Sequence, residues 1–218
     1  MPLKIPLPII YSITSGTATP QTTPDDPQFS AILRLAHAAV DTEVSLFQIR
    51  EKSLHARVLF DLVARAAEIT RGTNTRLIVN DRSDVARAAG ADGVHLTTHS
   101  LPAEVVRSIC GDEFVIGVST HSIDEARVAR DAGADFVVFG PVFETESKRG
   151  YGEPQGLDKL AEVAHALDEF PVVAIGGITL DNINECFHAG ASGVAAIRLL
   201  NDVAKMSSVV ESIRSRFN

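Results

Sequence analysis

The chain has 218 residues, of which 45% are hydrophobic and 22% are charged, and this composition fits one globular domain with a full core. We expect that domain to cover residues 1–218. The formal net charge of −8, without a basic stretch, excludes nonspecific binding of nucleic acid, which needs a basic face. No uncharged apolar run approaches the roughly 20 residues that cross a bilayer, so a membrane is not expected as a partner either.

Two features of the sequence bear on its compartment. Cys110 and Cys186 are its only cysteines, and they show neither metal-ligand spacing nor a disulfide framework. Such cysteines are typical of small buried side chains in a reducing cytoplasm. The opening stretch MPLKIPLPIIYSITS is broken by prolines, so it predicts a first strand rather than a secretory signal peptide. We therefore expect a cytoplasmic protein.

Short apolar runs alternate with amphipathic stretches along the chain. The predicted strands cover 7–14, 44–50, 76–80, 93–97, 114–119, 136–140, 171–175 and 193–198. The predicted helices lie near 27–40, 55–71, 83–89, 102–110, 122–132, 157–168, 180–189 and 202–216, and Ser122 with Glu125 predicts a capping box. This alternation predicts an α/β fold, a (β/α)8 TIM barrel, with a doubly wound open sheet as the alternative.

One helix-to-strand turn is repeated in the sequence. The copies are AGADGV at 89–94, AGADFV at 132–137 and AGASGV at 189–194. Gly90, Gly133 and Gly190 would end the helices in the left-handed conformation that glycine tolerates. We interpret these glycines as structural, on the barrel face opposite the active site.

Polar residues follow the second and third predicted strands, where a barrel places its active site. Gln48, Arg50 and Lys52 alternate onto one face and predict an anion site. The alternative is a solvated strand end in which Arg50 pairs with Glu51 or Asp81. Asn80 and Asp81 end the third strand, and Asp81 suits a helix cap or a metal ligand equally well.

The next strand ends offer a possible acid/base group. His95 lies inside the fourth strand and is interpreted as a packed histidine, whereas His99 is on a loop with no assigned role. Ser119 and His121 alternate after the fifth strand, and a histidine there is a candidate acid/base group or an exposed residue at a helix start.

The last three strand ends predict phosphate binding. Thr145, Ser147 and Lys148 supply two hydroxyls and an ammonium on a glycine-containing loop. Gly176-Gly177 follows the seventh strand, and AAIR ends the eighth, where many barrels hold a phosphate through backbone N–H groups. A monophosphate site beside a more cationic site suits a phosphorylated acceptor next to a diphosphate donor.

The chain resembles the thiamine-phosphate synthase / TenI family over nearly its whole length. The matching segments are QIREK, NDRSDVARAAGADGVHL, GVSTHSIDEA, GADFVVFGPVFETESK and PVVAIGGI. The resemblance implies a TIM barrel that acts in thiamine biosynthesis. Family synthases join hydroxymethylpyrimidine diphosphate to thiazole phosphate and release pyrophosphate, assisted by Mg²⁺.

The resemblance also implies roles for individual residues. Asp81 would bind Mg²⁺, and Ser119 would assist at the pyrimidine or the leaving group. The implied diphosphate contacts are Gln48, Arg50, Lys52, Asn80 and Lys148. The implied thiazole-phosphate contacts are Thr145, Ser147, Gly177 and the Ile197 backbone.

Two departures from the synthase pattern keep alternatives open. The family places an aspartate that binds Mg²⁺ where this chain has Ser100, and the sequence leaves open whether Ser100 or a neighbour such as Asp84 compensates for it. Arg198 replaces a frequent serine and would either strengthen the phosphate site or point away. A thiazole tautomerase, which needs no metal and would use His121, is therefore the alternative, followed by a non-catalytic thiazole-phosphate binding protein. A homodimer is possible, and segment 14–28 is expected to form a loop over the barrel mouth.

Overall fold

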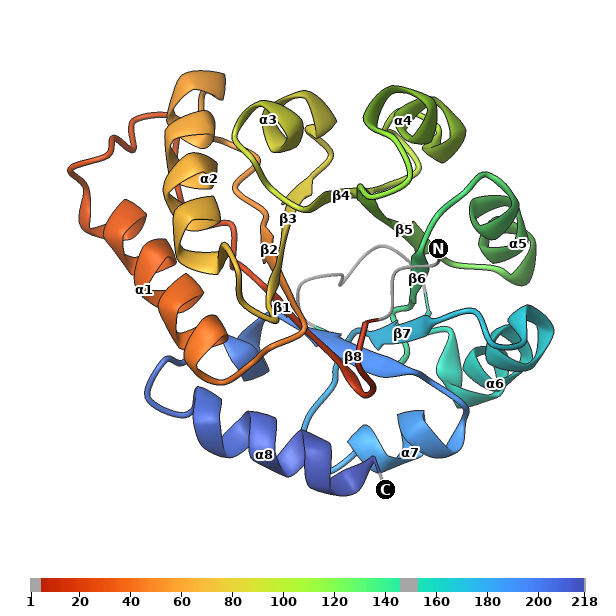
Figure 1. Cartoon of the computed structure of the whole chain (residues 1–218). Coiled ribbons are helices and arrows are strands. Elements are labelled where there is room, and N and C mark those ends of the chain that lie inside the picture. Colours follow the sequence, from red (N-terminus) through yellow and green to blue (C-terminus); the bar gives the residue numbers. More distant parts are fainter. Residues whose placement is uncertain (1–4, 146–152, 218) are drawn as a thin grey trace.

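A computed structural model describes residues 5–145 and 153–217. Eight parallel strands, hydrogen-bonded in sequence order from β1 to β8 and back to β1, form a closed barrel with the helices outside (Figure 1). The predicted TIM barrel is therefore confirmed, and the doubly wound open sheet is wrong. None of the helices in the described ranges has the length and apolarity of a membrane span.

The elements lie within a few residues of their predicted bounds. The strands are β1 Ile9–Ile13, β2 Leu46–Ile49, β3 Arg76–Asn80, β4 Gly93–Leu96, β5 Val115–Thr120, β6 Phe136–Phe139, β7 Val172–Ile175 and β8 Gly193–Ala196. The helices are α1 Pro27–Asp41, α2 Ala56–Thr70, α3 Ser83–Ala88, α4 Ala103–Cys110, α5 Ile123–Asp131, α6 Gly156–Leu167, α7 Ile183–His188 and α8 Met206–Arg216, with a short 3-10 helix η2 at Arg198–Leu200.

The strands have two buried faces, which explains their nearly continuous apolar sequences. One set of side chains packs between the barrel wall and the helices, as Phe47 and Val79 do. The alternate set fills the barrel interior, with Ile9, Tyr11, Leu46, Ile78, Val115, Phe136, Val138 and Val173 in one cluster. Residues that continue the second set toward the carboxyl ends of the strands therefore point into the barrel mouth.

Within the described residues the repeated turn is found four times, once more than the sequence predicts. Gly90, Gly133 and Gly190 have φ of 78°, 86° and 90°, which confirms their left-handed conformation. Glu43 takes the same place after α1 with φ of 54°. The fourth copy was missed because a glutamate stands where the other copies have glycine.

The residue two places after each of these turns caps a neighbouring strand. Asp92 and Asp135 accept the N–H groups of Leu77 and Ile116 at 2.8 and 2.7 Å. Ser45 and Ser192 accept those of Ile10 and Val172 at 3.1 and 3.4 Å. A side-chain oxygen directly before β2, β4, β6 and β8 thus accepts an N–H group near the start of the preceding strand, at the barrel end opposite the mouth.

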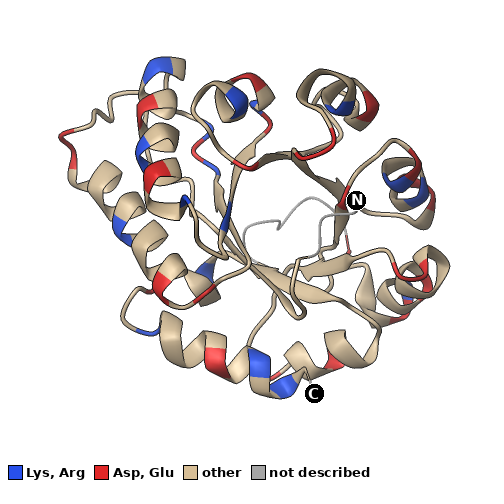
Figure 2. Ribbon diagram, viewed as in Figure 1, with Lys and Arg blue, Asp and Glu red and all other residues tan. Residues whose placement is uncertain are grey.

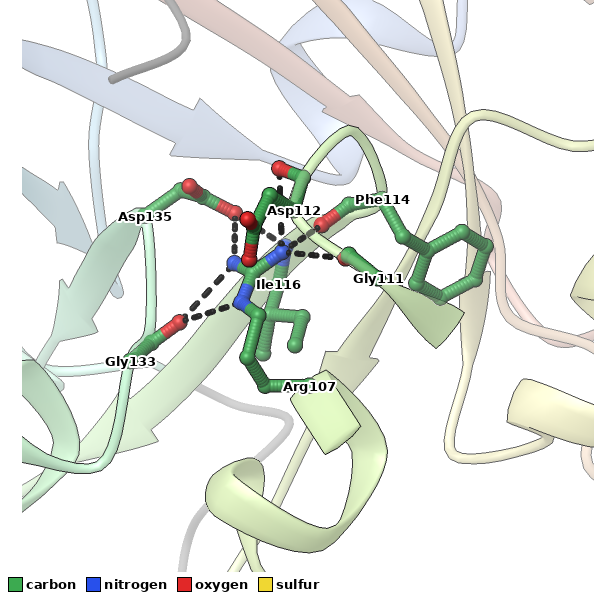
Figure 3. Close-up of polar contacts among 7 residues, drawn as sticks. All are labelled: Arg107, Gly111, Asp112, Phe114, Ile116, Gly133 and Asp135. Atoms are coloured by element: carbon green, nitrogen blue, oxygen red, sulfur yellow. Dashed lines mark hydrogen bonds and ion pairs between the residues drawn. The ribbon is translucent and has the colours of Figure 1, made fainter. Parts of the chain in front are cut away.

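Arg107 of α4 stabilises this amino-terminal end further (Figure 3). Its guanidinium donates to the carbonyl oxygens of Gly111, Asp112, Phe114 and Gly133 and forms a 2.8 Å ion pair with Asp135. One side chain therefore joins the end of α4, the start of β5 and the turn before β6.

We expect Arg107→Met to lower the free energy of unfolding by about 2–4 kcal/mol, because partly buried carbonyls and the Asp135 carboxylate lose their donor. Urea unfolding would measure the change. Arg127→Met is the matched control, since the 3.9 Å pair of Arg127 with Asp124 is exposed. Equal losses in the two variants would contradict the prediction.

Candidate active site

Gln48 and Asn80 lie side by side at the mouth end of β2 and β3. Gln48 is 1% exposed, and its Nε2 donates to Asn80 Oδ1 at 3.2 Å. Gln48 Oε1 is buried without a hydrogen-bond partner among the residues that the structure describes. Arg50 follows, half-buried, and Lys52 is exposed. Figure 2 shows most charged positions on the outer helices and loops.

Glu51 binds the loop that follows β1 rather than Arg50. Glu51 is 3% exposed, and its carboxylate accepts the N–H groups of Gly16 and Ala18 at 3.1 and 2.9 Å. A Cβ at Gly16 would lie 3.5 Å from Arg50 Nη1, so this loop runs directly beside the guanidinium. The Glu51 carboxylate therefore has hydrogen-bond donors without the alternative Arg50–Glu51 pair. The loop before α1 lies beside Arg50, where it can shape the predicted anion site.

We expect Glu51→Gln to raise the KM for a diphosphate substrate several-fold and to lower the free energy of unfolding by about 1–3 kcal/mol. The amide would place a donor against one of the two loop N–H groups, which then stays unpaired in a buried place. Steady-state kinetics and thermal unfolding would measure both effects. Unchanged KM and stability would contradict a role of Glu51 in holding the loop.

Asp81 is the exposed carboxylate at the end of β3. Its backbone has φ of 63°, and its N–H donates to the His95 carbonyl oxygen at 2.9 Å. Asp84 does not join it, because Arg82 donates to both Asp84 oxygens at 2.8 and 2.6 Å and lowers the pKa of that carboxyl. Within residues 5–145 and 153–217 no group of three or more acidic, histidine or cysteine side chains could hold a metal.

Ser100 is engaged within its own loop. Its Oγ accepts the Thr97 N–H at 2.8 Å and lies 3.2 Å from Thr97 Oγ1. It is a neutral oxygen and a weak ligand for a hard cation. Asp81 is therefore the carboxylate that fits a cation at this mouth, which suits Mg²⁺ because that ion keeps several waters and also binds substrate phosphates.

His95 is a packed interior residue, as predicted, and it contacts Ser119. Its Nε2 lies 2.8 Å from Ser119 Oγ, and the residue is 4% exposed. Burial and, to a lesser degree, the positive charge of Arg50 lower the pKa of His95 to about 4. The ring is therefore neutral at neutral pH. Sequence reasoning placed His95 in the core but did not connect it with Ser119.

This shift makes stability depend on pH. The unfolded chain binds a proton at His95 below about 6.5 and the folded chain only below about 4, so stability decreases as the pH falls through that window. We expect His95 to contribute roughly 3 kcal/mol to this loss. Urea unfolding of the parent and of His95→Phe from pH 7 to 4 would measure this contribution. The difference between their unfolding free energies separates the effect of His95 from that of other titrating groups. A pH-independent difference would contradict the prediction.

His121 and Ser119 have different partners. His121 Nδ1 lies 3.3 Å from Glu125 Oε2, which also accepts the His121 N–H at 2.7 Å. Ser122 Oγ accepts the Glu125 N–H at 3.2 Å, so the predicted cap is confirmed. The Glu125 side chain, however, binds His121 instead of closing a reciprocal capping box on Ser122. The histidine thus lies directly before the N-cap residue of α5 and is half-exposed.

The glycine pair after β7 packs against the chain that follows β6. Phe143 N–H donates to the Gly176 carbonyl oxygen at 3.1 Å. A Cβ at Gly177, whose φ is 65°, would lie 2.5 Å from the Glu144 carbonyl oxygen. Close approach between two loops is therefore one reason for glycine here, besides access to an anion. Thr145 ends this described stretch, and the predicted residues Ser147 and Lys148 lie outside the described residues.

The turn after β8 is fastened to β1 by a residue that sequence reasoning missed. Asn201 Nδ2 donates to the Ile13 carbonyl oxygen at 2.7 Å and also to that of Ile197. Ile197 directly precedes η2, in which Arg198 is exposed. Asn182 plays a similar part after β7, since its Nδ2 donates to the Gly177 carbonyl oxygen at 2.9 Å. The sequence does contain a signal for these two contacts, because one asparagine follows β7 and another follows β8 by a few residues.

A family model described as thiamine monophosphate synthase matches residues 20–200. The chain belongs to this family. It is 36% identical to a thiamine-phosphate synthase of Haloarcula marismortui, covering 94% of this chain and 95% of that one. It is 41% identical to a thiamine-phosphate synthase of Roseiflexus sp., covering 87% and 76%.

A solved structure supports the same family. Thiamine phosphate pyrophosphorylase from Pyrococcus furiosus superimposes with a TM-score of 0.78 at 28% identity, and 96% of each chain is covered. The predicted family resemblance is therefore confirmed over nearly the whole barrel, including the strand ends where Gln48, Asn80 and Ser119 lie.

Proposed function

We propose that the protein is a thiamine-phosphate synthase, a transferase that joins hydroxymethylpyrimidine diphosphate to thiazole phosphate and releases pyrophosphate. The observation that supports this most directly is the group of polar side chains at adjacent strand ends in a family whose relatives bear that name. Gln48 and Asn80 are hydrogen-bonded to each other there, Arg50 lies two residues after Gln48, and Asp81 directly follows Asn80.

Departure of pyrophosphate is the step that this mouth is suited to assist. Arg50 and Lys52 follow Gln48 after the end of β2, and the proposal has these two cations and Lys148, from the loop after β6, bind the diphosphate together with the amides of Gln48 and Asn80. Such groups stabilise the negative charge that develops on a leaving diphosphate without having to reorganise. The pyrimidine cation that is left is then attacked by the thiazole nitrogen, for which holding both substrates in the correct orientation matters most.

We propose that Asp81 holds Mg²⁺ together with substrate oxygens and water. When bound, Mg²⁺ would neutralise charge on the diphosphate as it leaves. Ser100 already pairs with Thr97 and Asp84 with Arg82, so one protein carboxylate is proposed to be sufficient.

The thiazole phosphate is proposed to lie at the ends of β7 and β8. Backbone N–H groups at Gly177 and Ile197 would bind its phosphate, with hydroxyls from Thr145 and Ser147. Arg198, exposed in η2, would add a charge at the rim of that site. The close packing of Gly177 against Glu144 supports this proposal, because it brings the loops after β6 and β7 together.

The names of the relatives favour the synthase over a thiazole tautomerase and over a silent binding protein. His121 stays a predicted catalytic residue, in contact with Glu125. We also propose that the 218 residues form one domain. A cytoplasmic location is part of the proposal as well, and the free thiols of Cys110 and Cys186 support it. A homodimer stays a prediction that light scattering would test.

The deciding experiment combines the pure protein with both substrates and follows pyrophosphate and thiamine phosphate, with Mg²⁺ or with a chelator. We expect equal amounts of the two products, and only with Mg²⁺. The thiazole carboxylate tautomer is then added to a second sample. Isomerisation without any thiamine phosphate would support the tautomerase, and binding of thiazole phosphate without either reaction would support the binding protein.

A further inference from the structure

The contact between His95 and Ser119 joins the barrel interior to the mouth. His95 lies on β4 beside Gly117 of β5, and Ser119 is the next residue of β5 that points inward. His95 Nε2 and Ser119 Oγ are 2.8 Å apart. Ser119 is partly exposed, whereas His95 is buried beneath it.

The surroundings of the histidine ring hold it in one orientation. The Tyr11 ring lies 5.9 Å and the Phe136 ring 6.4 Å from it, measured between centroids. Gly117 makes room for this packing, because a Cβ there would lie 2.3 Å from the Phe136 ring. Rotation of the imidazole would need these rings to move, so its Nε2 stays directed at Ser119.

The unpartnered nitrogen of His95 indicates which tautomer is present. Nδ1 is buried and, among the described residues, has no hydrogen-bond partner. A neutral imidazole has one N–H donor and one bare acceptor. A buried donor without a partner is rarer than a buried acceptor without one. The proton therefore belongs on Nε2, which donates to Ser119 Oγ.

We propose that His95 is a positioning residue of the active site, which donates from Nε2 to Ser119 Oγ and thereby directs the Ser119 hydroxyl hydrogen into the barrel mouth. This inference rests on the proposed function. The directed hydrogen suits an anionic oxygen of the diphosphate, next to the donors of Arg50 and Gln48. Without the His95 donor the Ser119 hydroxyl would also populate orientations in which its hydrogen does not point into the mouth.

A double-mutant cycle with His95→Phe, Ser119→Ala and the double variant tests the connection. His95→Phe keeps the ring packing and removes the donor, and we expect kcat to fall about tenfold. Ser119→Ala should lower kcat by at least as much. The double variant should be no slower than Ser119→Ala, since His95 acts through the hydroxyl. If the losses in kcat of the two single variants multiplied in the double variant, the proposal would be overturned.

His95→Gln supplies a control, because its amide can donate in place of Nε2. We expect it to recover a large part of the kcat lost in His95→Phe, with thermal unfolding recorded for all variants. A glutamine variant as slow as the phenylalanine variant, at equal folded fraction, would contradict the proposal.

A measurement without turnover separates this inference from the proposed function. Nitrogen-15 NMR of histidine-labelled parent protein at neutral pH should show a protonated Nε2 and a bare Nδ1 for His95, with the Nε2 signal shifted in Ser119→Ala. The opposite tautomer, or no shift, would overturn the inference even in an active synthase. A protein without synthase activity that still shows the tautomer and the shift would overturn the proposed function alone.

Discussion

Asp81→Asn is expected to lower synthase turnover about 100-fold at saturating substrates and to raise the Mg²⁺ concentration that gives half-maximal activity. The amide keeps the size of the side chain but removes the negative charge that a hard cation requires. Losing charge stabilisation of a leaving group typically costs about 10²–10³ in kcat. Pyrophosphate release at several Mg²⁺ concentrations would measure both effects.

Asp84→Asn is the matched control, because Asp84 is three residues away and already paired with Arg82. We expect its turnover to stay within about twofold of the parent, since an exposed ion pair of this kind contributes little. Equal losses in both variants would indicate that the local charge, rather than a ligand at Asp81, matters. Normal activity of Asp81→Asn would remove this residue from the proposed Mg²⁺ site.

Gly177→Ala is expected to lower the free energy of unfolding by about 3 kcal/mol or more and to raise the KM for thiazole phosphate at least tenfold. Two costs add: a left-handed backbone at a residue with a side chain, and a Cβ placed 2.5 Å from the Glu144 carbonyl oxygen. The loops after β6 and β7 must then separate. Urea unfolding and steady-state kinetics would measure the two effects.

Gly72→Ala separates these two costs. Gly72 has φ of 76°, and apart from Gly72 and its two chain neighbours no described residue has an atom within 4 Å of the position that a Cβ would take. It therefore carries only the backbone cost, about 1–2 kcal/mol, with no change in KM. Similar losses at Gly72 and Gly177 would show that the contact with Glu144 is unimportant.

The number of strands, their order and the residues at their ends could all be predicted from local patterns. Apolar runs such as 136–139 and the repeated glycine turns are set by neighbours along the chain, and both are present as predicted. The fourth turn, at Glu43, was missed because contacts there hold a residue that does not prefer a left-handed backbone. Its side chain accepts from Asn74 and lies 3.8 Å from Arg214.

The sequence by itself therefore determined the barrel, the family and the strand ends that form the mouth, because period and spacing depend on residues close in the chain. Only the tertiary structure decided which side chains are partners there. The Glu51 carboxylate accepts from the loop at Gly16 rather than pairing with Arg50, and His95 contacts Ser119, which is 24 residues away in the sequence. Such pairings depend on barrel closure and on neighbouring strands, which bring together residues that no local pattern relates.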